Sequence, residues 1–95
     1  MPAYVLVELS IHDPDLYHEY KQLTPDTIKA YGGQFVVRGG KTEPLEGEWH
    51  PERIVLLEFP SVERAREWWH SEQYTRARLI RQKAAETKMI ILEGI

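Results

Sequence analysis

Charged side chains that could bind a small molecule gather in one glycine-rich segment of the chain. Two glycine pairs, Gly32-Gly33 and Gly39-Gly40, flank a short apolar run that ends at Arg38. Glycine enters the left-handed backbone region without a Cβ penalty, so each pair can end the element that precedes it. Arg38 would then be held at the end of a strand, where its planar guanidinium could bind a carboxylate or a carbonyl oxygen.

Glutamates supply both a structural partner for Arg38 and a candidate base. An ion pair of Arg38 with Glu46 or Glu58 would give the arginine a structural role instead of a binding role. Glu58, late in an apolar run, could act as a general base, or it could lie in water or in a salt bridge at the sheet end. Glu8 and Glu93 hold similar positions in two other apolar runs. Glu8 and Glu58 belong to the first and third of the predicted strands. We take these two strands as parallel neighbours and therefore expect Glu8 and Glu58 to lie near the same end of the sheet.

Aromatic side chains could form the walls of such a site. The candidates are Tyr20, Tyr31, Trp68 and Tyr74, which offer hydroxyl or indole donors on apolar rings, as small-molecule pockets often do. The alternative for each of them, and above all for Trp68, is the hydrophobic core. Glu46 and Ser71 could also contact a ligand. Ser71, however, precedes a predicted helix, where its hydroxyl can cap the helix N-terminus. No His and Asp spacing around Ser71 indicates a catalytic triad.

Composition argues against several classes of partner. The 95 residues include 12 basic and 15 acidic side chains, a net charge of -3, which does not favour nucleic acid or an anionic membrane. There is no cysteine, and the four histidines are scattered without metal-binding spacing. Neither a G-x-G-x-x-G nor a Walker phosphate loop is present. We therefore expect no metal and no cofactor, and we expect a cytoplasmic protein without a membrane segment.

The C-terminal part of the chain is rich in basic side chains. Arg76, Arg78, Arg81 and Lys83 are interleaved with Glu72 and Glu86. Mixed charge of this kind is typical of the solvated face of a helix, and that is the expected role of these residues.

Alternating apolar runs and capping signals predict the secondary structure. Asp13-Pro14, Ser61 and Ser71 read as helix starts, and Thr24-Pro25-Asp26 predicts a kink or break inside the first helix. The predicted strands span residues 3–9, 34–38, 53–59 and 88–93; helices follow residues 13, 61 and 71, and a polar loop covers residues 39–51.

The resulting β-α-β-β-α-β order predicts one α+β domain over residues 1–95. Right-handed crossovers fold this order into a ferredoxin-like unit, a four-stranded antiparallel sheet with its helices on one face. Three of the strands are apolar on both faces, although a face open to water should alternate with polar residues. At ~25 cal/mol per Å2 of apolar surface, leaving that face wet would cost several kcal/mol. A second copy of the sheet could cover it, so we expect a homodimer.

A series of residues along the chain resembles a known family. It includes Tyr31-Gly32-Gly33, Arg38-Gly39-Gly40, Glu46-Gly47, Arg53, Glu58-Phe59 and the run from Trp68 to Tyr74. The chain is similar to the domain of unknown function 1330 family of the dimeric α/β-barrel superfamily, apart from Trp69 and Glu72, where tyrosine and proline are expected. The resemblance implies a homodimer in which two sheets form a barrel. Superfamily relatives include cofactor-independent monooxygenases, muconolactone isomerase-like proteins and haem-binding enzymes, so the fold alone does not name a reaction.

Two hypotheses of different class follow. In the first, the homodimer binds a small organic acid or aromatic metabolite near Arg38, Glu58, Trp68 and Tyr74, and any catalysis is cofactor-independent proton transfer or monooxygenation. In the second, the chain is a non-enzymatic small-molecule-binding or protein-interaction module. The second hypothesis predicts that Arg38 is fully paired with carboxylates of the protein.

Overall fold

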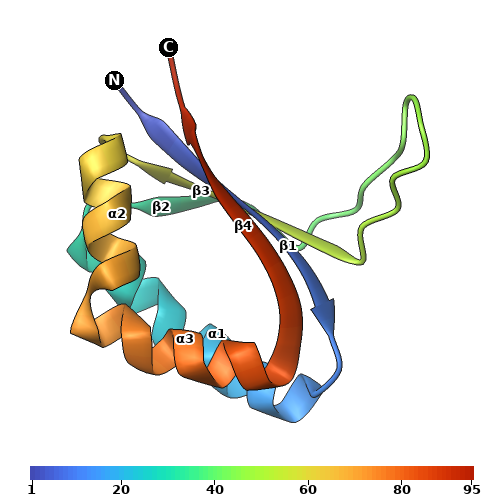
Figure 1. Ribbon diagram of the computed structural model, residues 1–95, viewed down its shortest axis with the longest axis horizontal. Helices are drawn as coiled ribbons and strands as arrows, with labels where there is room; N and C mark the ends of the chain where they lie inside the picture. Colours follow the sequence, from blue (N-terminus) through green and yellow to red (C-terminus); the bar gives the residue numbers. More distant parts are fainter.

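One antiparallel sheet carries all of its helices on a single face (Figure 1), and the structure, a computed structural model, describes residues 1–95. Its strand order is β2-β3-β1-β4. The elements are β1 (Ala3–Ile11), α1 (Pro14–Ala30), β2 (Gln34–Arg38), β3 (Arg53–Phe59), α2 (Val62–His70), α3 (Glu72–Ala84) and β4 (Ala85–Glu93). The predicted ferredoxin-like fold is confirmed. The strands β1 and β4 are longer than expected, and β4 follows α3 without a loop.

Side chains at the predicted positions cap the three helices. Asp13 accepts a hydrogen bond from the backbone N–H of Leu16, and Ser61 accepts one from the N–H of Arg64, each at 3.1 Å. Ser71 separates α2 from α3 and accepts from the N–H of Tyr74, also at 3.1 Å. Each such cap stabilises a helix by about 1 kcal/mol. The cap role predicted for Ser71 is therefore confirmed.

The first helix is continuous through Pro25, so of the two predicted alternatives, a kink or a break, the break is wrong. Proline has no N–H, which leaves the carbonyl four residues earlier, that of Lys21, without its helical donor. The adjacent Thr24 hydroxyl donates to the Tyr20 carbonyl at 2.6 Å and adds a bond within this turn. The helix therefore continues beyond Pro25, and the Lys21 carbonyl has no donor within the helix.

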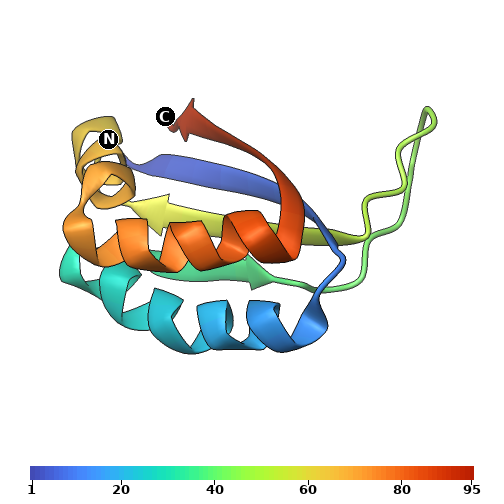
Figure 2. The same cartoon turned by 60° about the horizontal axis from the view of Figure 1, so that its bottom comes forward.

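The helix-facing side of the sheet holds the hydrophobic core. In β1, residues 3, 5, 7 and 9 are buried, while the residues between them face the other way. The largest fully buried side chains of this core are Phe59, Trp68 and Tyr74. Figure 2 shows the helices on one side of the sheet and the long loop between β2 and β3 extending from one end of it.

The opposite face of the sheet is open and largely apolar. Leu6 pairs with Leu56 across β1 and β3 and with Ile90 across β1 and β4. Ile90 and Leu92 are 55% and 41% exposed. This is the apolar face from which a homodimer was predicted.

The two strand glutamates lie at opposite ends of this open face, and the expectation that they share one end is wrong. Strands β1 and β3 are antiparallel, with Glu8 opposite Ile54 and Glu58 opposite Tyr4. Four residues of strand correspond to ~13 Å. The physical reason is the hairpin: the helical crossover makes β1 and β2 run the same way, and the β2–β3 connection then reverses the chain.

Basic residues of α3 also depart from the expected solvated face. The Arg81 side chain is buried, with only 5% of the residue exposed. Arg78 is half-buried, and its guanidinium carbon lies 3.9 Å from the centre of the Trp69 ring. Arg76 and Lys83 are exposed as predicted. The mixed charge pattern of α3 therefore does not show which of its arginines are buried.

Candidate functional site

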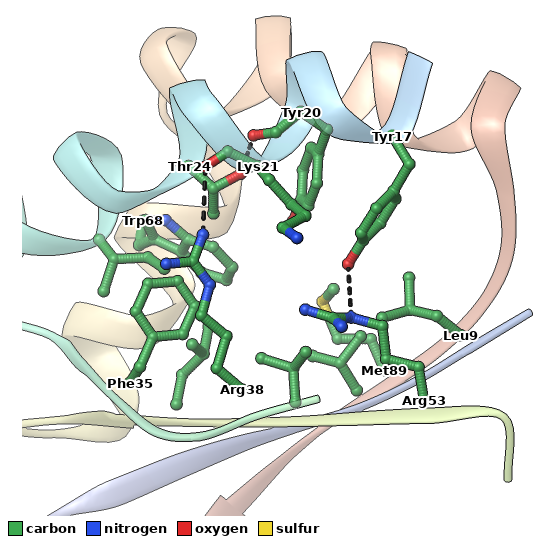
Figure 3. A pocket seen from close by; sticks show the side chains of 14 residues that line it. Leu9, Tyr17, Tyr20, Lys21, Thr24, Phe35, Arg38, Arg53, Trp68 and Met89 are labelled. Carbon is green, nitrogen blue, oxygen red and sulfur yellow. Dashed lines mark hydrogen bonds between the residues drawn. The ribbon is translucent and has the colours of Figure 1, made fainter. Parts of the chain in front are cut away.

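A narrow pocket lies between α1 and the helix-facing side of the sheet (Figure 3). Fourteen residues line it, ten of them hydrophobic, including Tyr17 and Tyr20 of α1, Phe35 of β2, Trp68 of α2 and Met89 of β4. The space that the centre of a water molecule can occupy is only about 20 Å3. A cavity needs roughly 10–15 Å3 of such space to hold one water. The pocket therefore has room for about one water molecule.

Three cationic side chains reach into this pocket from three elements. They are Lys21 of α1, Arg38 at the end of β2 and Arg53 at the start of β3, and Figure 3 shows their charged ends directed into the same space. No Asp or Glu belongs to the lining. The ion pair between Arg64 and Glu67 is the only one within 4.0 Å in the protein, so none of the three cations is paired. The pocket is apolar, positively charged and free of compensating carboxylates.

Arg38 is positioned by the free carbonyl that Pro25 creates. Its guanidinium donates to the Lys21 carbonyl at 3.2 Å and lies 4.3 Å from the centre of the Phe35 ring. Without the proline, that carbonyl would accept from the N–H of residue 25 within the helix. Arg38 therefore contacts the helix backbone and an aromatic ring, and the alternative in which it pairs with Glu46 or Glu58 is not observed.

A β-bulge directs Arg38 into the pocket. Phe35 pairs with Leu57 and Arg38 pairs with Val55, while the register shifts between Phe35 and Val37. In a regular strand, residues three apart point to opposite faces of the sheet. The extra residue at the bulge brings Phe35 and Arg38 to the same helix-facing side. Bulges occur next to functional sites, where they redirect a side chain in this way.

Arg53 forms the opposite wall of the pocket. Its Nε donates to the Tyr17 hydroxyl at 3.2 Å, and its guanidinium carbon lies 5.5 Å from the centre of the Tyr17 ring. Gly39 leaves room for this side chain, since a Cβ at that position would collide with the Arg53 guanidinium. Gly39 also has a φ of +70°, which a residue with a Cβ rarely adopts. Gly39, which directly follows Arg38, therefore also leaves room for Arg53.

The inner wall is a buried aromatic cluster with satisfied polar groups. The Tyr20 and Tyr74 hydroxyl oxygens lie 2.9 Å apart, and the Trp68 indole donates to the Thr27 hydroxyl at 3.0 Å. The Trp68 and Tyr74 rings have centroids 4.0 Å apart. Burial raises the pKa of Tyr20 well above its usual value, and the Tyr74 hydroxyl raises it further, while Arg81 and Thr24 oppose the shift. Tyr20 therefore stays protonated at neutral pH.

The remaining predicted residues lie outside this pocket. Glu58 is on the open face of the sheet, where it accepts a hydrogen bond from Gln34 Nε2 at 2.8 Å. Tyr31 and Ser71 line a separate surface hollow. Glu46 is exposed in the loop between β2 and β3. The structure thus brings together Arg38, Tyr20 and Trp68, with Tyr74 packed behind them, and separates the other four from them.

Sequence reasoning missed two of the three cations. Lys21 lies four residues after the buried Tyr17 and three before the buried Thr24, and this helical spacing marks it as facing inward. Arg53 is the first residue of β3, and its side chain lies beside Gly39 in the structure. Only its hydrogen bond to Tyr17 shows that this side chain is directed toward α1.

The helices and the potential metal ligands were also compared with what a membrane span and a metal site require. No helix has the length and apolar character needed to cross a bilayer. No cluster of three or more His, Cys, Asp or Glu side chains that could hold a metal ion occurs.

Comparisons with solved structures agree with the ferredoxin-like fold. A protein of unknown function from Rhodopseudomonas palustris is 24% identical, with a TM-score of 0.76 over 99% of this chain and 82% of that one. A dimeric ferredoxin-like protein of unknown function from Jannaschia is 14% identical, with a TM-score of 0.74 over 99% and 100%. SnoaB, a cofactor-independent oxygenase from Streptomyces nogalater, is 9% identical, with a TM-score of 0.67 over 99% and 93%.

No match was found among curated proteins. The chain matches the family described as "Domain of unknown function (DUF1330)" over residues 2–95, which is almost its whole length. The family resemblance seen in the sequence is thereby confirmed, and the chain belongs to this family.

Proposed function

We propose that the protein binds a small organic anion with an apolar or aromatic body in the pocket between α1 and the sheet. The observation that carries the proposal is the set of three cations, Lys21, Arg38 and Arg53, in an apolar lining without an acidic residue. A carboxylate at about 4 Å from one of them gains roughly 4 kcal/mol of Coulomb energy at an effective dielectric constant of 20, before desolvation. A neutral ligand gains none of this energy, so the pocket favours an anion.

Arg38 is the side chain that admits the ligand. It is exposed, and the protein holds it by one hydrogen bond and one ring contact. The inner wall, in contrast, is fully buried and hydrogen-bonded. Rotation of Arg38 away from the Lys21 carbonyl opens the space that a ring requires, and the freed guanidinium can then bind the carboxylate in a bidentate manner.

We infer further that two copies associate through the open face of the sheet. Its apolar side chains would otherwise stay in water at several kcal/mol. The related protein from Jannaschia is described as dimeric, which supports this arrangement. Each copy keeps its pocket on the opposite, helix-facing side, so dimerisation leaves both pockets accessible.

A second candidate function is cofactor-independent monooxygenation in the same pocket. The specific support is the juxtaposition of cations, which would stabilise an enolate or phenolate, with the Tyr17 hydroxyl beside Arg53. In such a reaction an activated methylene becomes a carbonyl, one oxygen atom of O2 enters the product and the other leaves as water. SnoaB, which shares the fold, is described as a cofactor-independent oxygenase. Glu58 lies on the other face of the sheet and takes no part in this reaction.

Calorimetric titration tests the binding proposal. We expect benzoate to bind and its neutral counterpart, benzyl alcohol, to bind much more weakly. Arg38→Gln should reduce benzoate affinity about 10- to 100-fold, since a hydrogen bond to a charged group is worth about 1.5–3 kcal/mol. Arg76→Gln, an exposed arginine outside the pocket, is the matched control. Equal affinities for the two ligands, or an unchanged affinity in Arg38→Gln, would contradict the proposal.

Oxygen consumption separates the enzyme from the binding module. Aromatic compounds with an activated methylene that bind in the calorimeter are incubated with the protein in an oxygen electrode cell without added cofactor. Uptake of one O2 per substrate consumed, with one atom of 18O2 in the product and no hydrogen peroxide, supports monooxygenation if it is lost in Arg38→Gln. Tight binding without any uptake across the series assigns the protein to the non-enzymatic class.

A further inference from the structure

A second cavity lies on the other side of the inner wall, between β4 and the corner where α2 meets α3. Its volume is about 420 Å3, and seven of its twelve lining residues are hydrophobic. It shares two residues, Trp68 and Met89, with the first pocket, so these side chains separate the two spaces. Its basic and polar lining includes Arg66, His70, Arg81 and Thr87, and again no Asp or Glu.

The base of this cavity holds a buried arginine without a partner. Arg81 is 95% buried in the fold, and its Nε makes no hydrogen bond. No ion pair within 4.0 Å involves its guanidinium. A largely buried arginine without a carboxylate partner is unfavourable, and native proteins rarely leave a buried polar group unpaired without a functional reason.

A buried hydroxyl from β4 has the same property. The Thr87 Oγ1 atom has no hydrogen-bond partner, although it can both donate and accept. Thr87 of β4 and Arg81 of α3 line the same cavity. Two unsatisfied polar groups beside one cavity indicate that a ligand completes their hydrogen bonding.

We propose that this cavity is a second binding site, which takes an organic carboxylate through the Arg81 guanidinium and the Thr87 hydroxyl. A carboxylate offers two oxygens that match the arginine fork and can also accept from a hydroxyl. Trp69, Met89 and Ile91 supply an apolar wall for the remainder of the ligand. This proposal does not depend on the first pocket, because Lys21, Arg38 and Arg53 do not line the second cavity.

The three tryptophan indole N–H signals provide a test by nuclear magnetic resonance. Trp69 lines only the second cavity, Trp68 lines both cavities, and Trp49 lies in the exposed loop. In a benzoate titration of the 15N-labelled protein, we expect the Trp69 and Trp68 signals to shift and the Trp49 signal to stay. Benzyl alcohol should leave Trp69 in place, and inorganic phosphate should move it less than benzoate does.

Variants in the first pocket and in the second cavity show which of the two spaces produces the benzoate-induced shift of the Trp69 signal. Arg81→Met should abolish the Trp69 shift, and Thr87→Val, which keeps the side-chain shape, should weaken the benzoate affinity reported by Trp69 at least threefold. Arg38→Gln should leave the Trp69 response intact while removing the effect at the first pocket, so the two proposals can fail separately. Replacing an unpaired buried arginine by methionine is expected to preserve the fold.

Several outcomes overturn the second site. These are a Trp69 signal that does not move with benzoate, a shift that survives both Arg81→Met and Thr87→Val, and a shift that disappears in Arg38→Gln. If Arg81→Met fails to fold, an unchanged affinity in Thr87→Val is sufficient to overturn the proposal. A response to phosphate as large as that to benzoate would replace the carboxylate class by that of inorganic anions.

Discussion

The two faces of the sheet carry opposite kinds of chemistry. On the helix-facing side, Lys21, Arg38 and Arg53 enter an apolar pocket without a carboxylate. On the open side, Glu8 and Glu58 lie at the two ends of an apolar surface, and each accepts a hydrogen bond from a neighbouring side chain. Strand alternation thus places the proposed ligand-binding pocket and the proposed association surface on opposite faces of the sheet. Substitutions on one face should therefore leave the function of the other face intact.

Loss of the inner wall should produce the largest effect on the helix-facing side. Trp68→Ala removes a fully buried ring, its contact with Tyr74 and its bond to Thr27. Substitutions of this kind lower the free energy of unfolding by about 3–5 kcal/mol. Urea denaturation measures the change, with Leu45→Ala as control, expected within about 0.5 kcal/mol of the parent because Leu45 is 97% exposed in the loop. A small effect for Trp68→Ala would mean that neighbouring side chains can fill the space left by the indole without a loss in the free energy of unfolding.

A charge on the open face should break association without touching the pocket. Leu56→Asp places a carboxylate opposite Leu6, in the middle of the apolar surface. We expect the dimer dissociation constant to rise at least 100-fold, about 2.7 kcal/mol, in sedimentation equilibrium. Benzoate affinity per chain should stay within about twofold. A parallel loss of benzoate binding would show that the two faces are not independent.

The buried tyrosine pair should give an intermediate effect that depends on pH. Tyr20→Phe leaves the Tyr74 hydroxyl without its partner and should lower the free energy of unfolding by about 1–3 kcal/mol at pH 7. Because burial raises the pKa of Tyr20, the unfolded chain loses this proton first as the pH rises past about 10, and the native state loses stability from there upward. Tyr20→Phe lacks this term, so its stability should fall less steeply above pH 10. Parallel urea midpoints of the two proteins between pH 9 and 11 would contradict the assignment.

The hydrogen bond between Arg38 and the Lys21 carbonyl should have the smallest effect, and Pro25→Ala removes it. Pro25→Ala restores an N–H that satisfies the Lys21 carbonyl within the helix, so Arg38 loses its acceptor. Because this bond must break before Arg38 can bind the carboxylate, we expect benzoate affinity to rise about threefold, equivalent to ~0.7 kcal/mol, which is within the usual net value of a hydrogen bond. Helix stability should also rise, since proline is unfavourable in a helix interior. A rise in both calorimetric affinity and melting temperature distinguishes this effect from general damage, which would lower both.

Local features of the fold could be predicted from the sequence. The caps at Asp13, Ser61 and Ser71 depend on neighbouring backbone groups, so residue type and spacing are sufficient. The apolar character of both sheet faces could likewise be read from the strands. These features depend on contacts close along the chain or on simple alternation.

Features that depend on distant contacts could not be predicted. The bulge before Arg38 arises from pairing with β3, and it decides which face the arginine occupies. The burial of Arg81 depends on how α3 lies against the sheet, which its mixed charge pattern conceals. The separation of Glu8 from Glu58 follows from strand direction, which was misjudged.

A crystal structure with 4-bromobenzoate would test the central claim most directly, since the bromine can be located by its anomalous signal. The account predicts a ring between α1 and the sheet, with its carboxylate within hydrogen-bond distance of Arg38 or Arg53 and with Arg38 turned away from the Lys21 carbonyl. An empty first pocket at saturating ligand, with Arg38 still bound to that carbonyl, would contradict it.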